Sequence, residues 1–321
     1  MLSDKGVKEV TLLGQNVNSY ADFGKGPRNS TLFSSRSGET DGFEAHYAPG
    51  FKSVYVPSRQ GATTFAHLLD AVARVDPEMR IRFTSPHPKD FADDVLSVMA
   101  LHHNVCKQVH MPAQSGSTSV LSRMRRGYGR EAYDALVSSV RAQLPGVALS
   151  TDMIAGFCGE TEEEHRMSIE LLREHRYDQA FLFAYSEREK THAARHFEDD
   201  VSQETKLRRL QELIETYRAG LLERGAQEVG RTHLVLVEGP SKRSDGALTG
   251  RTDTFKRVVF DDVAVPAQYI ETAGQTLVKL GVGDYVAVKI VQGGGGVLSG
   301  VPLGRTTMTE FIQKHGCAVP L

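Results

Sequence analysis

Residues 109–129, VHMPAQSGSTSVLSRMRRGYG, decide the fold of this chain. The apolar-biased residues 107–111 predict a buried strand, and Pro112 ends it. The small polar residues 114–117 follow, and a helical period of apolar residues begins at Val120. A polar loop therefore lies where a strand ends and a helix begins. Folds built from repeated βα units place their chemistry in such loops.

The rest of the chain repeats this order of strand, polar loop and helix. Four more strands are predicted at residues 8–13, 80–84, 147–154 and 179–185. Three of the predicted helices begin at Thr63 or Thr64, at Asp90 and at Thr161. Two more cover residues 130–144 and 204–224. The alternation predicts an α/β fold with a parallel sheet, whose polar loops converge on one rim as in a full or partial barrel.

Composition bounds the class of protein. The chain has 321 residues, 40% of them hydrophobic and 24% charged, which is typical of a globular protein with about two domains. The formal net charge of -2 means that any nucleic-acid-binding face must be local. No apolar run is long enough to span a membrane. Cys106, Cys158 and Cys317 are scattered and form no CxxC, which indicates reduced thiols in an intracellular protein.

Three regions differ in pattern. Residues 1–227 hold the βα repeats, interrupted at 22–60 by a Gly-, Ser- and Pro-rich stretch without period, which we interpret as a surface loop insertion. Residues 228–306 contain short strand-like pieces separated by Gly, Ser and Asp, which predict a small all-β barrel. Residues 307–321 form a tail.

Several motifs in order carry a family resemblance. They are EVTLLGQNVN at 9–18, HxPxQSGS at 110–117, MxRGY at 124–128 and DxIxGFxGET at 152–161. Together they resemble MiaB-type methylthiotransferases, radical S-adenosylmethionine enzymes that act on tRNA. VLVEGxSK at 235–242 with GRT at 250–252 resembles the RNA-binding TRAM domain. Residues 76–90 and the preceding insertion resemble the eukaryotic mitochondrial branch, first described as binding a regulator of a cyclin-dependent kinase.

The resemblance implies a fold and an activity. The fold would be a partial parallel βα barrel of the radical SAM type, its first strand missing, followed by a TRAM barrel. The activity would be tRNA-2-methylthio-N6-isopentenyladenosine synthesis, with sulfur insertion and methylation at adenine C2 of an anticodon-loop isopentenyladenosine. The implied cofactors are S-adenosylmethionine and two 4Fe–4S clusters. The implied location is mitochondrial, with the cytoplasm as the alternative, and a kinase-regulator protein is a further implied partner.

The cysteines depart from the family pattern. The family's CxxxCxxC is absent, and none of the three cysteines matches a cluster ligand. We therefore expect no catalytic residue and no metal ligand in this chain, which resembles an N-terminally truncated member. The alternative function is a catalytically dead RNA-binding or regulatory interaction fragment.

The candidate cofactor-binding residues come from the resemblance and follow three predicted strands. They are Gly14, Gln15, Asn16 and Asn18, then Gln114, Ser115 and Gly116, then Asp152, Gly156 and Glu160. Each group has a structural alternative: a strand-to-loop turn, a helix N-cap by Ser115 or Ser117, and a favourable charge at a helix N-terminus for Glu160. The strand-end histidines are His110, which we assign to structure, and His87, which stays open.

The candidate RNA-binding residues gather in the small β-domain. They are Lys242, Arg243, Arg251, Lys256 and Arg257, a local excess of positive charge over Asp245 and Asp253 that predicts a phosphate clamp. Phe255 would stack a base or complete the small core. The basic runs 123–126 and 206–209 would contact phosphates or form solvated helix faces, and the second reading suits the second run better.

Overall fold

The first part of the chain is a parallel sheet covered by helices on one side. The computed structural model describes residues 2–24, 48–52, 62–91, 93–269 and 276–316. Strands β1 (Glu9–Leu12) and β4 (Arg80–Phe83) pair in parallel, as do β5 (Gln108–His110), β6 (Ala148–Ala155) and β7 (Gln179–Ala184). A parallel bridge between Ile81 and Val105 joins the two pieces. The predicted α/β class with five parallel strands is therefore confirmed.

Helices alternate with these strands, as predicted. They are α1 (Phe65–Ala73), α2 (Asp93–Leu101), α3 (Thr118–Arg123), α4 (Arg130–Gln143) and α5 (Glu162–His175), preceded or interrupted by short 3-10 turns at Ser3–Lys5, Val17–Ser19 and Pro88–Asp90. Their apolar faces pack on one side of the sheet, where Ile81, Val109 and Met153 are fully buried. Burial of that face is the main favourable term in the stability of this domain.

Local capping signals fix most helix starts. Thr64 and Thr161 form capping boxes, and the Ser117 hydroxyl accepts from the amide of Val120. The predicted cap at Asp90 is wrong, because α2 begins at Asp93. Asp90 is instead buried, and its carboxylate accepts a hydrogen bond from the Ser19 hydroxyl.

The predicted insertion is only partly described. At its base, β2 (Ala21–Asp22) pairs with β3 (Thr63–Thr64). Ala48 and Phe51 are buried in the main core, so this part of the stretch is not the surface loop that we predicted. The prediction for residues 25–47 and 53–61 lies outside the described residues.

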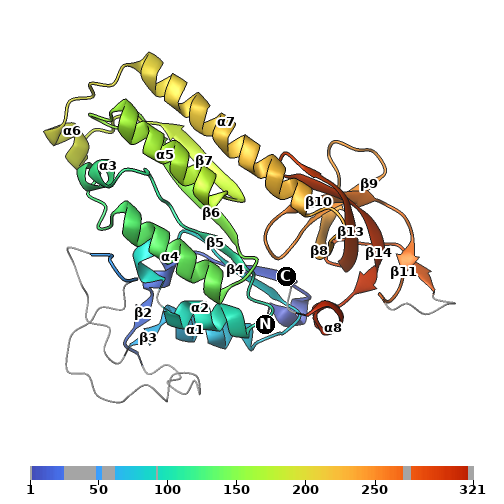
Figure 1. The fold of residues 1–321 in the computed structure, drawn as a ribbon. Coiled ribbons are helices and arrows are strands. Elements are labelled where there is room, and N and C mark those ends of the chain that lie inside the picture. Colours follow the sequence, from blue (N-terminus) through green and yellow to red (C-terminus); the bar gives the residue numbers. More distant parts are fainter. Residues whose placement is uncertain (1, 25–47, 53–61, 92, 270–275, 317–321) are drawn as a thin grey trace.

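A closed β-barrel forms the second part of the chain (Figure 1). Its strands are β8 (Thr232–Pro240), β9 (Ala247–Arg251), β10 (Arg257–Asp261), β13 (Tyr285–Gly294) and β14 (Val297–Thr306), closed in the order β10-β14-β13-β8-β9. The short pair β11 (Val265–Pro266) and β12 (Leu277–Val278) lies outside this barrel, and α8 (Met308–His315) packs against it. The predicted small all-β barrel is confirmed.

One long helix joins the two parts. After the short α6 (His192–His196), α7 (Gln203–Gln227) runs alongside α5 and β7 and ends at the barrel (Figure 1). Gly225 of α7 lies against the turn that joins β13 to β14: a Cβ on Gly293 would lie 1.8 Å from the Gly225 carbonyl oxygen. Only a pair of glycines permits this approach. No helix within the described ranges is long and apolar enough to cross a membrane.

The basic run of α7 is only in part the solvated face that we predicted, because Arg208 is exposed and two other cations are not. Lys206 and Arg209 are buried, at 4% exposure each. Lys206 pairs with Asp199 at 2.5 Å, and Arg209 pairs with Glu160 at 3.0 Å and Glu162 at 2.7 Å. The Arg209 pairs fix the start of α7 against the first turn of α5 and the loop before it, because a buried charge must keep its partner.

Candidate functional site

The face of the sheet opposite the helices carries the candidate site. Side chains alternate between the two faces of a strand, and the parallel register places Asp152 beside Phe181 and Ile154 beside Phe183 on this open face. Phe181 and Phe183 are 43% and 52% exposed. Two exposed aromatic rings on one face of a sheet make this face a candidate binding surface.

His110 and Asp152 add polar groups to the open face. The His110 Nδ1 lies 2.9 Å from the Ser150 hydroxyl, and its Nε2 lies 3.5 Å from the Asp152 carboxylate. The ring meets Phe181 edge-on, with 6.0 Å between centroids. These contacts agree with a structural role for His110, and they also place an orientable imidazole on the open face.

The loops after β1 and β4 hold each other. The Asn18 side-chain amide donates to the His87 carbonyl at 2.9 Å and accepts from the His87 amide at 2.8 Å. The His87 Nδ1 accepts from the Lys89 amide, and burial lowers the pKa of His87. Asn18 and His87 therefore hold the two loops together. Gln15 and Asn16, in the same loop as Asn18, are exposed.

The loop after β5 is packed under α5. The Gln114 backbone amide donates to the Asp152 carbonyl of β6, and the Gln114 carbonyl accepts from the Ile154 amide. The Ser115 hydroxyl and the Gly116 amide contact the Ser168 hydroxyl. A Cβ on Gly116 would lie 2.2 Å from the Met167 carbonyl oxygen. Of the two alternative N-caps, Ser117 is the one that the structure shows.

The loop after β6 is covered by α7. The Glu160 carboxylate accepts from the Gly156 amide at 2.7 Å and from Arg209, and burial raises the pKa of Glu160. Gly156 has a φ of 74°, and a Cβ there would lie 2.4 Å from Cγ of Lys206. The Lys206 side chain thus fills the space beside Gly156, one of the candidate cofactor-binding residues.

The ten candidate cofactor residues therefore differ in how far their polar side chains are available to a ligand. Those with exposed or half-exposed polar side chains are Gln15, Asn16 and Asp152, and their amide and carboxylate groups fit an amino acid or a ribose. The side chains of Asn18, Ser115 and Glu160 are buried and engaged within the protein. Gly14 is half-buried at the same rim.

The described cysteines do not fit an iron–sulfur cluster. Cys106 is buried next to Arg80 and Arg82 at the starts of the strands, where burial raises the pKa of its thiol. Cys158 is buried beyond the other end of the sheet with Val120 and Phe157. A cluster needs several thiolates at one point. Cys317 lies outside the described residues.

One group of possible metal ligands is already paired with an arginine side chain. Asp134, Glu174 and His175 lie close enough to share an ion. The Arg130 guanidinium pairs with Asp134 at 2.7 Å and with Glu174 at 2.5 Å. It supplies the positive charge that a metal would bring.

The five candidate RNA-binding residues do not form one exposed clamp. Lys242, Arg243 and Arg257 are exposed. Arg251 pairs with Glu238 at 2.9 Å and lies 4.0 Å from the ring centre of Phe255, and Lys256 pairs with Glu228 and with Asp178. Phe255 is half-buried under Arg251 and Arg82, so it belongs to the joint between the two domains rather than to the barrel core.

Sequence reasoning missed the two arginines that hold this joint. Arg80 donates to the carbonyl oxygens of Arg251 and Leu234, both at 2.7 Å. Arg82 donates to those of Thr252 at 2.8 Å and Asp253 at 2.7 Å. The signal was present in RIRF at residues 80–83, because a period of two places both arginines on one face of a strand.

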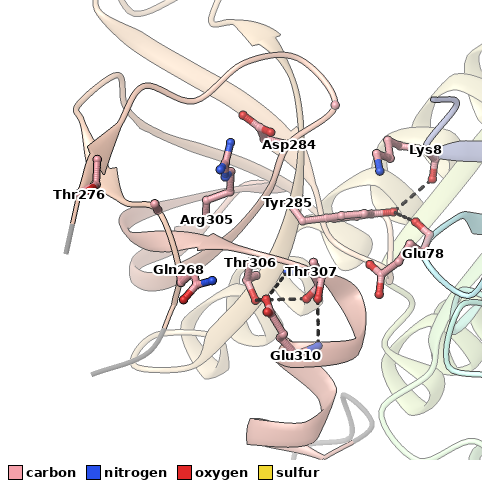
Figure 2. Close-up of a pocket in the computed structure, with 12 residues that line it drawn as sticks. Lys8, Glu78, Gln268, Thr276, Asp284, Tyr285, Arg305, Thr306, Thr307 and Glu310 are labelled. Carbon is pink, nitrogen blue, oxygen red and sulfur yellow. Dashed lines mark hydrogen bonds between the residues drawn. The ribbon is translucent and has the colours of Figure 1, made fainter. Parts of the chain in front are cut away.

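Two clefts flank the joint. Figure 2 shows the first, of about 590 Å³, where the Tyr285 hydroxyl donates to the Lys8 and Glu78 carbonyl oxygens at 3.1 Å each. The Glu78 carboxylate accepts from the amides of Met308 and Thr309 at the start of α8. The second cleft, of about 510 Å³, lies between α7, the strand starts and the barrel.

Glu228 makes the joint sensitive to acid. Burial would raise the pKa of this carboxyl, but His233 and Lys256 outweigh it and hold the pKa at about 2. Against an unfolded value near 4.5, the carboxylate contributes about 3 kcal/mol at neutral pH, which is lost as the pH falls from 4.5 to 2. We expect Glu228→Gln to lower stability at pH 7 and to flatten the acid limb of the pH–stability curve, measured by urea unfolding at each pH. An unchanged acid limb would contradict this assignment.

Comparisons with known proteins agree with this architecture. Residues 226–303 match the TRAM domain. The mitochondrial tRNA methylthiotransferase CDK5RAP1 of Rattus norvegicus is 52% identical over 96% of this chain and 50% of its own length. The human protein of that name is 50% identical over 97% of this chain and 49% of its own.

A bacterial relative is similar over a shorter range. The tRNA-2-methylthio-N(6)-dimethylallyladenosine synthase of Chlorobium luteolum is 45% identical over 81% of this chain and 50% of its own length. The chain spans about half the length of the curated relatives that it matches.

Proposed function

The chain is homologous to mitochondrial and bacterial tRNA methylthiotransferases, and we propose that it forms the part of such an enzyme that binds the tRNA nucleoside over an open sheet. The observation that carries this proposal is the 50–52% identity over nearly the whole chain, joined to a TRAM barrel fixed on the same sheet. The proposed substrate is a tRNA with an N6-isopentenyladenosine in its anticodon loop. The proposed reaction is thiomethylation at adenine C2.

We propose fewer cofactor-binding residues than the ten that the family resemblance implied. S-adenosylmethionine would supply the radical and the methyl group for this chemistry. We propose that Gln15, Asn16 and Asp152 contact it, because they offer polar atoms at or near the open face. Asn18, Gly116 and Glu160 would act by fixing the loops. No step is assigned to an iron–sulfur cluster, since the described cysteines do not converge.

Analysis of tRNA from the source organism tests the activity. Deleting the gene should abolish 2-methylthio-N6-isopentenyladenosine in hydrolysed tRNA and leave the isopentenyladenosine precursor to accumulate, measured by mass spectrometry. Re-expression of the intact gene should restore the product, and a variant with Asp152→Ala should restore less of it. Normal levels of the product in the deletion strain would refute the proposal.

The separated cysteines favour a second candidate for the chain alone, an RNA-binding or regulatory fragment without catalytic activity. The purified chain, given tRNA, S-adenosylmethionine, a reductant, iron and sulfide, distinguishes the two. Binding of tRNA without methylthiolated product indicates the fragment, whereas product indicates the enzyme. A kinase-regulator protein as partner stays a prediction.

We place the intact protein in mitochondria, because the rat, mouse and human relatives are named mitochondrial. Fluorescence of the tagged intact gene product, compared with a matrix marker, tests the location. Diffuse cytoplasmic signal would favour the alternative.

The exposed turn between β8 and β9 is the proposed phosphate contact on the barrel. Lys242 and Arg243 are exposed, so the double change to Ala should leave the fold intact. We expect tRNA affinity to fall for many sequences alike, and the slope of log affinity against log salt to fall by about one to two units. Fluorescence anisotropy over a salt series measures both. Arg173→Ala, an exposed arginine on α5, is the control, and a parent-like slope in the double variant would exclude the turn.

A further inference from the structure

The second cleft, between α7 and the barrel, has the size of a ligand site. Its volume is about 510 Å³, within the usual range for sites that enclose small molecules or single nucleotides. One wall is α7 and another is the start of strands β5 to β7. The remaining walls are the connection between β9 and β10 and the glycine turn between β13 and β14. In Figure 1 the end of α7 meets the barrel at this place.

The charge of the cleft is positive. Its lining includes five cationic side chains against two carboxylates: Arg218, Arg224, Arg251, Lys256 and Arg257 against Asp178 and Glu228. Both carboxylates are already paired, Asp178 with Arg224 and Glu228 with Lys256. Arg218 and Arg257 are exposed, and neither has a carboxylate partner within the described ranges. A site with unpaired guanidinium groups suits a polyanion.

The cleft also offers surfaces for bases. Phe255 and Tyr217 line it, together with the amide side chains of Gln108 and Gln179. Arg82 and Arg251 hold Phe255 in place, and Arg82 also donates to Oε1 of the Gln108 side chain at 3.1 Å. Aromatic rings accept any base, and amides can hydrogen-bond to base edges.

The cleft borders the candidate site, because one of its lining residues contacts His110. Ser150 and Gln179, which line it, are partners in the β6–β7 register. Ser150 is bonded to His110 on the open face. By contrast, the cleft of Figure 2 carries Lys8 and Arg305 against three acidic side chains, so it has no excess of positive charge.

We propose that the cleft between α7 and the barrel binds a single-stranded segment of RNA, with phosphates on Arg218 and Arg257 and bases against Phe255 and Tyr217. The proposal rests on the proposed function, since it assumes an RNA substrate. It assigns Arg218, outside the TRAM match, to RNA binding. It also makes the cleft the path by which RNA held by the barrel reaches the open face of the sheet.

Binding measurements on the full chain test this. The probes are tRNA and a 12-nucleotide single-stranded RNA, measured by fluorescence anisotropy between 0.05 and 0.5 M salt. One phosphate contact on a single strand contributes roughly 0.7 to the salt slope, so Arg218→Ala and Arg257→Ala should each weaken binding about fivefold at 0.1 M salt. Arg218→Lys should keep the slope. Arg173→Ala is the matched control and should bind like the parent.

Crosslinking gives a second readout that needs no variant. RNA carrying 4-thiouridine should crosslink to peptides that contain Tyr217 or Phe255, identified by mass spectrometry. If the parent binds RNA but both alanine variants keep its affinity and slope, or if crosslinks map only to the Lys242–Arg243 turn, the cleft is not the RNA site and the proposed function stands. If the parent binds no RNA at all, the proposed function fails first.

Discussion

Arg80→Ala should lower the free energy of unfolding by about 3–5 kcal/mol, one of the largest single effects expected in this chain. The Arg80 side chain is 1% exposed and donates to the carbonyl oxygens of Arg251 and Leu234. Its removal takes the Arg80 donor from two carbonyl oxygens, one of them fully buried, and leaves a cavity beside Tyr285. Urea unfolding followed by circular dichroism measures the loss.

Two further variants separate the causes. Arg80→Met keeps most of the packing volume, so a loss close to that of Arg80→Ala would assign the effect to the hydrogen bonds. Arg173→Ala removes an exposed arginine and should change stability by no more than about 0.5 kcal/mol. If Arg80→Ala unfolds at the urea concentration of the parent, the arginine does not hold the two domains together.

Gly293→Ala should separate α7 from the barrel and cost about 2–3 kcal/mol or more. The new Cβ would lie 1.8 Å from the Gly225 carbonyl oxygen, and both atoms belong to backbones that cannot rotate away. We expect a lower thermal midpoint and faster proteolysis near residue 228, where the joint opens. Thermal unfolding and limited proteolysis with mass spectrometry measure the two effects.

The helix itself supplies a matched pair of controls. Gly225→Ala places a Cβ 2.8 Å from the Gly294 amide nitrogen, so it should destabilise. Gly220→Ala meets nothing within 4 Å and should stabilise α7 by about 0.5–1 kcal/mol, because alanine is the better helix former. Opposite signs for the same substitution five residues apart would establish the close contact. Equal signs would contradict it.

Local patterns determined the secondary structure. Short apolar runs that end in polar loops indicated the five parallel strands, and threonine or serine before an apolar period indicated three helix starts, because these signals act between residues close in sequence. The short strands of the barrel were also predicted, because Gly, Ser and Asp separate them in the sequence. The motifs of residues 110–117 and 152–161 also indicated the family that the relatives show.

The sequence could not determine which polar residues face outward. Glu160 and Arg209 lie 49 positions apart and bury each other's charge, and Asn18 binds a backbone 69 positions away. Lys206 covers Gly156, and Phe255 and Lys256 turn toward the joint instead of toward solvent.

The docking of the barrel on the sheet, through Arg80 and Arg82, was decided only by the tertiary structure. Arg80 and its acceptor in Arg251 are separated by 171 residues, and a local pattern holds no information on such a distance. The same holds for Arg218 and Arg257, which come from different elements and share a cleft only because the two glycines of the joint allow α7 and the barrel to touch.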